Sequence, residues 1–350
     1  MKNKIIFIGG IGSSSEFGGV LTKNKNIIAI LKKHNYNCRT IDTNQSRGNI
    51  AKLSCIFINI LFVYLFTKRT IIFSTSFGNI YPIIKILYYI PIKRDVIYWG
   101  IGGLFANRVK NGEFKAKYMK LFSHILVEGN MMKDTLIECG LKNIEVVPNF
   151  KEIQTLPIIN KFDDGKIHLV FLSRIHPEKG VPYIFKAMEI LNKNGYKNKY
   201  EVDFYGQLND LYMNEFNDWI AKLPNAKYCN IINLLDWENY GKLAQYHFML
   251  FPTYWHGEGF PGVIIDAFIS GVPILASDWN LNSEFIKNKT TGIIIPTHNC
   301  DELYKEMQSI IDGNYNLNQM AINCQKEVKL YNTTNVLNDK FLLKLFNSEC

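Results

Sequence analysis

Residues 251–278 constrain the fold of this chain more than any other segment, because they place two acids at the junction of a strand and a helix. An apolar run ends at Phe251, a glycine-rich turn follows, and the apolar run Val263–Phe268 predicts the start of a helix. The backbone N–H groups at a helix start are unpaired and attract anions. Glu258 lies in the turn and Asp266 follows after seven intervening residues, so the two carboxylates would contact separate parts of one ligand. The pattern suits a polyhydroxylated ligand that carries phosphates. The structural alternative is that Glu258 caps the helix and that Asp266 lies on its solvated face.

A second loop carries two cations at another strand-to-helix junction. Arg174 and Lys179 follow the apolar run Ile167–Leu172 and precede the helical pattern Val181–Leu191. Arginine offers a planar fork to phosphate oxygens and lysine a compact charge, so the pair can neutralise a diphosphate. On their own, two cations in a loop are more often solvated surface groups. Both loops together, in this order and separated by two further strand-helix units, favour one binding site.

The two loops resemble the nucleotide-sugar-binding region of retaining family-4 glycosyltransferases with the GT-B fold. That family has Arg-x4-Lys-Gly in one loop, matched here by residues 174–180, and Glu-x7-acid in the other, with Asp266 standing where Glu is more usual. The resemblance implies an α/β protein of two Rossmann-like, doubly wound parallel-sheet domains that face a cleft. It covers most of the chain and is strongest over residues 166–296.

The resemblance also assigns roles to individual residues. Glu258, Arg174 and Lys179 would be catalytic, with the cations on the departing diphosphate and Glu258 on hydroxyls of the donor sugar. Asp266 would bind the ribose. The other donor-binding positions, of which Gly206 and Leu235 would lie near the base, are Gly18, Gly19, Gly206, Leu235, Gly259, Phe260, Gly262 and Val263. Two further candidates are His256, for which a packed or solvent-facing imidazole is the alternative, and Glu284, for which a helix start is the alternative.

The implied reaction transfers a sugar from a nucleoside-diphosphate sugar, with UDP or GDP as the nucleotide, and retains the anomeric configuration. It needs no metal and no cofactor. The acceptor would be a glycan or a lipid-diphosphate-linked glycan in cell-surface polysaccharide synthesis. Many relatives carry a histidine at the end of a first-domain strand, and the matching segment here, Tyr98–Gly103, has none. A sugar-nucleotide 2-epimerase of the same fold and a non-catalytic donor-binding subunit are the alternatives.

The N-terminal segment contains a further glycine-rich turn. Gly9–Gly19 follows the apolar run Ile5–Ile8 and leads into the helical pattern Leu21–Lys33. The spacing is not G-x-G-x-x-G, and Asp42 has only this imperfect loop to accompany it, which argues against a dinucleotide-binding Rossmann unit. The short apolar run at the start predicts a strand and not a signal peptide.

Apolar runs alternate with helical patterns along all 350 residues, which predicts parallel sheets in two domains. The predicted domains are residues 1–155, residues 156–330, and a terminal segment, 331–350, whose helix crosses back to the first domain. The predicted strands of the first half are Ile5–Ile8, Cys38–Ile41, Thr70–Ser74, Asp95–Trp99, Ile125–Glu128 and Glu145–Val147. Those of the second half are Ile167–Leu172, Tyr200–Tyr205, Asn230–Ile232, His247–Phe251, Pro273–Ala276 and Gly292–Ile295.

Charge is divided unevenly between the two halves. Residues 1–150 hold 21 Lys and Arg against 8 Asp and Glu, a net charge of +13, whereas the remainder holds 19 against 23, a net charge of −4. The difference favours an anionic partner for the first half. No nucleic-acid module is recognisable, so an anionic membrane surface or a lipid-diphosphate acceptor fits better. Seven scattered cysteines without paired spacing indicate reduced thiols, so the expected location is cytoplasmic, peripheral on the inner face of the plasma membrane.

Two apolar runs lie in the basic half. Leu53–Phe66 and Ile80–Ile92 are both too short for a comfortable transmembrane helix and are expected to be core helices on the sheet. The alternative is an interfacial role, in which aromatic rings beside basic residues contact a membrane. The rings that favour this alternative are Tyr64, Tyr81, Tyr88 and Tyr89.

Overall fold

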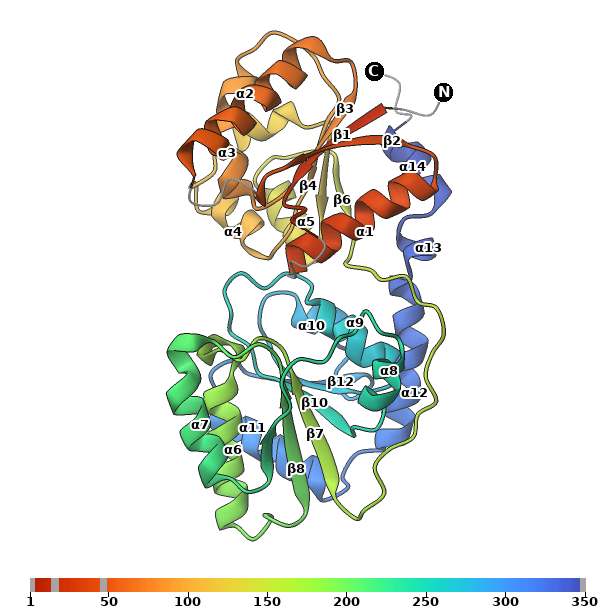
Figure 1. Ribbon diagram of the computed structural model, residues 1–350. Coiled ribbons are helices and arrows are strands. Elements are labelled where there is room, and N and C mark those ends of the chain that lie inside the picture. The colour runs from red at the N-terminus through yellow and green to blue at the C-terminus, as the bar shows by residue number, and fades with distance from the viewer. Residues whose placement is uncertain (1–3, 14–18, 45–48, 347–350) are drawn as a thin grey trace. The chain divides into compact units, whose positions relative to one another are not determined.

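The computed structural model describes residues 4–13, 19–44 and 49–346, which divide into two compact units (Figure 1). The first unit comprises residues 1–151 with 333–350, and the second comprises residues 152–332. The boundaries expected at 155 and 330 therefore differ from the observed ones by four and two residues. Each unit is built on a six-stranded parallel sheet with helices beside it, so the expected α/β class is confirmed.

The sheet of the first unit has the strand order β2-β1-β3-β4-β5-β6. Its central strands are buried along their whole length, which is why their sequences are continuous apolar runs. The strands are β1 Lys4–Gly9, β2 Asn37–Asp42, β3 Thr70–Ser74, β4 Val96–Trp99, β5 His124–Val127 and β6 Ile144–Val146. The main helices are α1 Gly19–Lys33, α2 Ile50–Phe66, α3 Phe77–Tyr88, α4 Leu104–Lys110 and α5 Asn130–Glu138, with a 3-10 turn at Ala116–Leu121.

The C-terminal segment packs on the first unit through two short helices, α13 Thr333–Val336 and α14 Asp339–Phe346. Leu342, Leu345 and Phe346 join the same buried cluster as residues of β1 and α1. The ring centroids of Phe346 and Tyr36 lie 4.8 Å apart. The amphipathic pattern of the last helix is thus satisfied by burial against the sheet of this unit.

The sheet of the second unit has the strand order β12-β11-β10-β7-β8-β9. Its strands are β7 Ile167–Leu172, β8 Tyr200–Tyr205, β9 Ala226–Tyr228, β10 Phe248–Phe251, β11 Ile274–Ser277 and β12 Gly292–Ile295. Its helices are α6 Val181–Lys193, α7 Met213–Lys222, α8 Glu238–Leu243, α9 Gly262–Ile269, α10 Asn282–Phe285, α11 Cys300–Ile311 and α12 Leu317–Glu327. The strand predicted at 230–232 is wrong, because β9 precedes it: Asn230 adopts a φ of 61°, which ends the extended run, and Ile231 is exposed.

The two apolar runs of the first unit behave differently. Helix α3 is a core helix as expected, and it buries Phe77, Ile80, Ile83, Ile84 and Leu87. Helix α2 buries only Ile60, Val63 and Tyr64, so the expectation of a core helix is wrong for its outer face. Tyr64 lies inside, where its hydroxyl donates to the carbonyl oxygen of Ile92 at 2.8 Å. Within the described residues, no helix has the length and apolarity needed to cross a membrane.

The strand order of the second unit places the two motif loops next to each other. Strand β7 pairs with β8 on one side and with β10 on the other, so the direction of winding reverses between β7 and β10. In an open parallel sheet, the loops that leave the carboxyl ends of such neighbouring strands border a ligand-binding crevice. Here these loops are residues 173–180 and 252–261.

A half-buried histidine at the opposite end of the strands of this sheet generates a prediction for acid stability. His247 precedes β10, and its Nδ1 accepts a hydrogen bond of 3.0 Å from the His168 backbone N–H, which requires an unprotonated nitrogen. Burial, and then the charges of Lys161 and His168, lower the pKa of His247 to about 4. As the pH falls from about 6.5 to about 4, the unfolded chain therefore takes up a proton that the folded chain refuses, and the free energy of unfolding decreases.

We expect the His247→Asn variant, whose amide oxygen can accept the same hydrogen bond, to lose less stability than the wild type over this pH range. Because His247 is partly exposed, the difference should be roughly 1 to 2 kcal/mol and not the full linkage value. Urea unfolding at pH 7 and at pH 4.5 measures it. Parallel pH profiles for the two proteins would contradict the assignment.

Candidate functional site

A buried ion pair joins the two motif loops. Lys179, in the short 3-10 turn Pro177–Lys179 before α6, donates to Glu258 Oε2 from the loop after β10. The side chains are only 6% and 12% exposed. Thr253 Oγ1 donates to the same carboxylate oxygen at 3.1 Å. Burial lowers the pKa of Lys179, and the adjacent Glu258 opposes that shift. The alternative in which Glu258 caps the helix is wrong, and so is the alternative in which Lys179 is a solvated loop cation.

Arg174 supplies a second, exposed cation beside the pair. Its guanidinium lies 5.0 Å from the centre of the Trp255 ring, and Lys179 Nζ lies 5.7 Å from the same ring. Among the residues that the structure describes, no carboxylate forms an ion pair with Arg174. The guanidinium therefore keeps its five donors available to an anionic ligand.

Close backbone contacts hold the loops in this arrangement. Gly180 has a φ of 83°, and a Cβ there would lie 2.1 Å from the carbonyl oxygen of Pro252. The Tyr254 N–H donates to the Glu178 carbonyl oxygen at 2.8 Å, which ties the second loop to the first. Gly206, after β8, would place a Cβ 1.7 Å from the carbonyl oxygen of Ser173. Only glycine permits such approaches.

Helix α9 begins next to the ion pair. Pro261 precedes it without a side-chain cap, so the first N–H groups, those of Gly262 and Val263, have no intrahelical acceptor. Asp266 lies one turn further on and is 8% exposed. Tyr240 of α8 donates to Asp266 Oδ1 at 2.6 Å. Burial, followed by the nearby Asp266, raises the pKa of Tyr240. Asp266 is therefore not on a solvated face, and the alternative proposed for it is wrong.

The remaining predicted residues occupy varied positions. The Phe260 ring is buried and stacked on Phe285, with the ring centroids 3.6 Å apart, so it stabilises the loop by packing. His256 is mostly exposed, with its Nδ1 3.5 Å from a Glu178 oxygen. The other positions are Gly259 in the loop before α9, Glu284 in the short α10, the exposed Leu235, and Gly19 at the start of α1 in the first unit. Gly18 lies outside the described residues.

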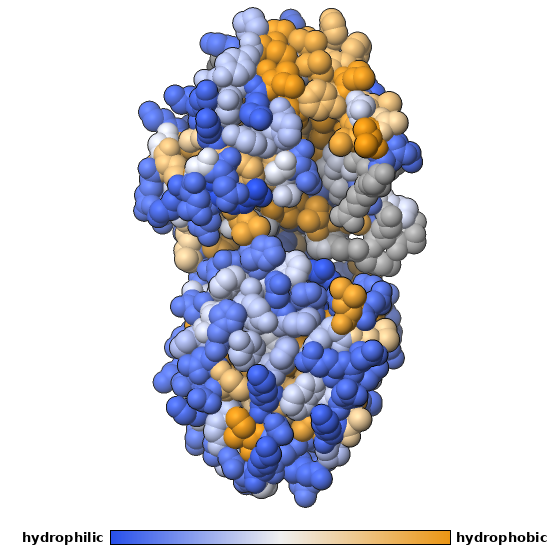
Figure 2. Space-filling model, turned by 90° about the vertical axis from the view of Figure 1, so that its left-hand side faces the viewer, coloured by the Kyte–Doolittle hydropathy of each residue, from blue (hydrophilic) through white to orange (hydrophobic). Residues whose placement is uncertain are grey.

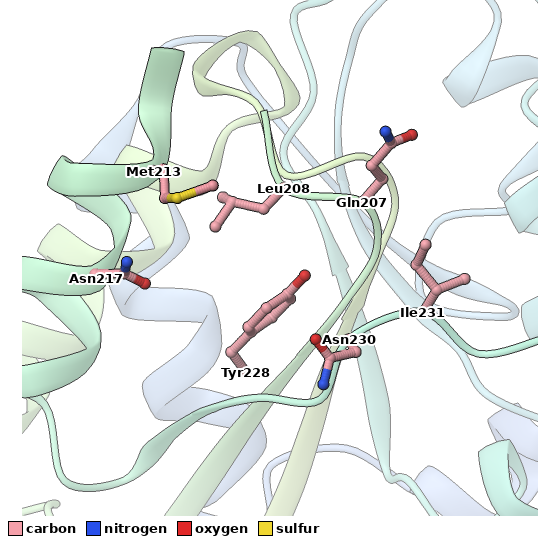
Figure 3. Close-up of a pocket in the computed structure, with 7 residues that line it drawn as sticks. All are labelled: Gln207, Leu208, Met213, Asn217, Tyr228, Asn230 and Ile231. Atoms are coloured by element: carbon pink, nitrogen blue, oxygen red, sulfur yellow. The ribbon is translucent and has the colours of Figure 1, made fainter. Parts of the chain in front are cut away.

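An open pocket of about 600 Å³ lies beside the carboxyl ends of β8 and β9. Figure 3 shows side chains from α7 and from the loops after both strands around it. Its lining consists of Gln207, Leu208, Met213, Asn217, Tyr228, Asn230 and Ile231. Gly206, which was expected near the nucleotide base, directly precedes the lining residue Gln207, whereas Leu235 is not among the lining residues. The aromatic ring and three amides of the lining suit a planar, polar ligand.

The glycine-rich loop of the first unit is held by Asp42. The carboxylate accepts hydrogen bonds from the N–H groups of Ile11 at 2.9 Å and Gly12 at 3.1 Å. Asp42, at the end of β2, thus stabilises the glycine-rich loop after β1. In a dinucleotide-binding Rossmann unit the corresponding acid binds the ribose, so this role supports the argument against such a unit. Nearby, Lys23 of α1 and Glu128 after β5 form a buried ion pair of 2.5 Å.

Sequence reasoning missed several residues of the site. Thr253, Trp255 and Tyr240 all contact motif residues, yet none stands at a spacing that marks it. An aromatic residue inside a motif loop was the available signal for Trp255. No local signal connects Tyr240 with Asp266, because 26 positions separate them and only tertiary packing brings them together.

Residues 152–327 match the family described as Glycosyl transferases group 1. The chain belongs to this family. The match covers the second unit almost completely and includes Arg174, Lys179, Glu258 and Asp266.

One protein of known activity is similar to part of this chain. The protein is 26% identical over 200 residues to the UDP-Gal:alpha-D-GlcNAc-diphosphoundecaprenol alpha-1,3-galactosyltransferase of Escherichia coli. The alignment covers 53% of this chain and 49% of that relative, so the chain spans about half the length of the curated relative it matches.

Solved structures with the same architecture cover nearly the whole chain. The apo lipopolysaccharide outer core galactosyltransferase WaaB superposes with a TM-score of 0.74 at 15% identity. Sucrose-phosphate synthase from Thermosynechococcus elongatus gives 0.75 at 12%, and Anabaena HepE in complex with UDP gives 0.69 at 13%. Each covers 99% of this chain and 100% of the other. The GT-B fold that the motifs implied is confirmed.

The contact between Gly180 and Pro252 gives a stability prediction with a matched control. Gly195 has a similar φ of 87°, but a Cβ there would meet nothing within 4 Å. Gly195→Ala should therefore cost only the left-handed backbone penalty, about 1 to 2 kcal/mol. Gly180→Ala should cost about 3 kcal/mol or more, because overpacking against Pro252 adds to that penalty. Urea unfolding compares the two variants, and equal losses would show that the loop contact contributes nothing.

Proposed function

We propose that this glycosyltransferase moves a hexose from a UDP-sugar to a lipid-diphosphate-linked glycan, with retention of the anomeric configuration, during cell-surface polysaccharide synthesis. The observation that carries the proposal is the buried Lys179–Glu258 pair with Arg174 beside it, at the reversal of winding in the second sheet. The activity of the Escherichia coli relative supports the donor and acceptor class, and the UDP complex of HepE supports the nucleotide.

The cations act on the leaving group in this proposal. When the bond between the anomeric carbon and the diphosphate oxygen breaks, negative charge develops on the diphosphate. Arg174 and Lys179 stabilise that charge without reorganisation, because their positions are already set by Trp255 and by the loop contacts. The N–H groups of Gly262 and Val263 add partial positive charge at the helix start. Fixed cations of this kind allow the reaction to proceed without a metal.

The carboxylates orient the donor. Glu258 Oε2 is engaged by Lys179 and Thr253, whereas Oε1 receives no hydrogen bond from any residue that the structure describes, so Oε1 is the atom proposed to accept from donor-sugar hydroxyls. Asp266, which Tyr240 holds in place, is proposed to bind the ribose. The pocket lined by Tyr228 and Asn230 is proposed for the base.

The test is a transfer assay with UDP-galactose, UDP-glucose, UDP-N-acetylglucosamine and GDP-mannose, each offered with a synthetic GlcNAc-diphosphate-lipid. We expect a disaccharide product from one UDP-sugar, with the donor's α configuration kept in its NMR coupling constants. A β-linked product would contradict retention. Epimerised donor without transfer would identify an epimerase, and binding without turnover would identify a donor-binding subunit.

Removal of either cation should lower turnover at a temperature at which the variant is still folded. Arg174→Ala and Lys179→Ala should each reduce kcat by about 10²- to 10³-fold, since one charge-stabilising group contributes about 2.7 to 4 kcal/mol to the transition state. The matched control is Lys193→Ala, because Lys193 is an exposed cation of the same unit in a surface pair with Glu189. Wild-type turnover in the Arg174 or Lys179 variant would overturn the diphosphate assignment.

A further inference from the structure

Helix α2 presents an apolar face that nothing in the described structure covers. Of its 17 residues only three are buried, whereas Phe62 is 57% and Phe66 is 71% exposed. Phe62 and Phe66 lie one helical turn apart with ring centroids 4.9 Å from each other. The apolar face of α2 consists of Ile58, Phe62 and Phe66, which are all exposed and follow one another at four-residue spacing. Figure 2 shows apolar residues gathered on the side of the first unit that carries α2 and α3.

Helix α2 is held in place by hydrogen bonds, so its exposed face is a defined surface of the folded protein. Arg94 donates from Nε to the Tyr64 carbonyl oxygen and from Nη2 to that of Leu65, both at 2.8 Å, which caps the C-terminal end of α2. The Tyr64 hydroxyl adds a hydrogen bond to the segment after α3. A helix anchored on one side keeps its other side turned outward.

The charged residues in the sequence around the apolar face are all basic. Residues 43–94 contain no Asp or Glu. In the described part of this segment, the exposed cations are Lys52, Lys68, Lys85 and Lys93. At the end of α3, Tyr89 is exposed, its ring centroid lies 5.3 Å from that of Tyr88 and 6.2 Å from that of Tyr118, and Lys117 Nζ lies 4.8 Å from the Tyr118 ring. Tyrosines beside lysines are typical of side chains at the boundary between lipid and water.

We infer that the apolar face of α2 lies in the headgroup region of an anionic bilayer, with the helix parallel to the membrane plane. The helix is too short to span a bilayer, yet Phe62 and Phe66 can enter the acyl boundary while the surrounding lysines meet anionic headgroups. A second copy of the chain fits this surface poorly, because a symmetric contact would bring the two basic rims together. The inference deepens the proposed function, in that a lipid-linked acceptor would be presented at the same membrane.

Flotation with vesicles tests the surface without any sugar donor, so its outcome is independent of the proposed reaction. The full chain is mixed with vesicles of phosphatidylcholine alone or of phosphatidylcholine with an equal part of phosphatidylglycerol, at low and at high salt. The apolar variant is Phe62→Ser with Phe66→Ser. Its matched control is Ile158→Ser with Leu211→Ser, two exposed apolar residues of the second unit.

We expect the wild type and the control to float with the anionic vesicles at low salt and to be released by high salt. The apolar variant should bind on the order of tenfold or more weakly, because two phenylalanine rings no longer leave water. Lys68→Gln with Lys93→Gln should weaken binding about fivefold for each charge removed. All variants should keep the melting temperature of the wild type, since the altered side chains are exposed.

Three results would overturn the inference: no flotation of the wild type with anionic vesicles, equal binding by the apolar variant and its control, or a vesicle-free dimer that the apolar variant alone disrupts. The last result would identify a second copy as the occupant. Transfer to a short, soluble acceptor by the apolar variant then reports on the enzyme separately. Loss of flotation with retained transfer supports both proposals, and flotation without any transfer supports the membrane surface alone.

Discussion

The ion pair between Lys179 and Glu258 is the interaction on which the site depends. Both charges are largely withdrawn from water, which costs free energy unless each has a close partner and further hydrogen bonds. Thr253 supplies one of those bonds, and the Trp255 ring covers the lysine. Removing one member would leave the other as an unpaired buried charge. The pair therefore forces the loops after β7 and β10 to stay together, and strand pairing at the reversal of winding makes that possible.

The same pair explains how the charges of the site are balanced before a ligand binds. Lys179 is neutralised by Glu258, whereas Arg174 is exposed and carries no carboxylate partner in the described chain. In our proposal, an arriving diphosphate first meets Arg174 and the start of α9, and then shares Lys179 with Glu258. Glu258 is then held beside the sugar by a lysine that also contacts the leaving group. Binding of the donor and stabilisation of its departing charge would thus be properties of one small network.

The sequence predicted much of this arrangement because the relevant signals are local. Apolar runs and other strand patterns predicted eleven of the twelve strands, and both motif loops were placed correctly at the carboxyl ends of β7 and β10. The predictions were wrong where tertiary packing determines the position of a strand or the burial of a residue. Strand β9 lies earlier than predicted because Asn230 takes a left-handed conformation. The burial of Asp266 against Tyr240 and the exposure of α2 both depend on which neighbours are present, and an apolar run shows no difference between a buried helix and an exposed one.

A crystal structure of the protein with UDP would show directly where the diphosphate binds. We expect the diphosphate within hydrogen-bond distance of Arg174, of Lys179 and of the N–H groups at the start of α9, with the ribose at Asp266 and the Lys179–Glu258 contact retained or shared. A diphosphate bound elsewhere in the second unit, with Arg174 and Lys179 in contact with solvent only, would contradict the account.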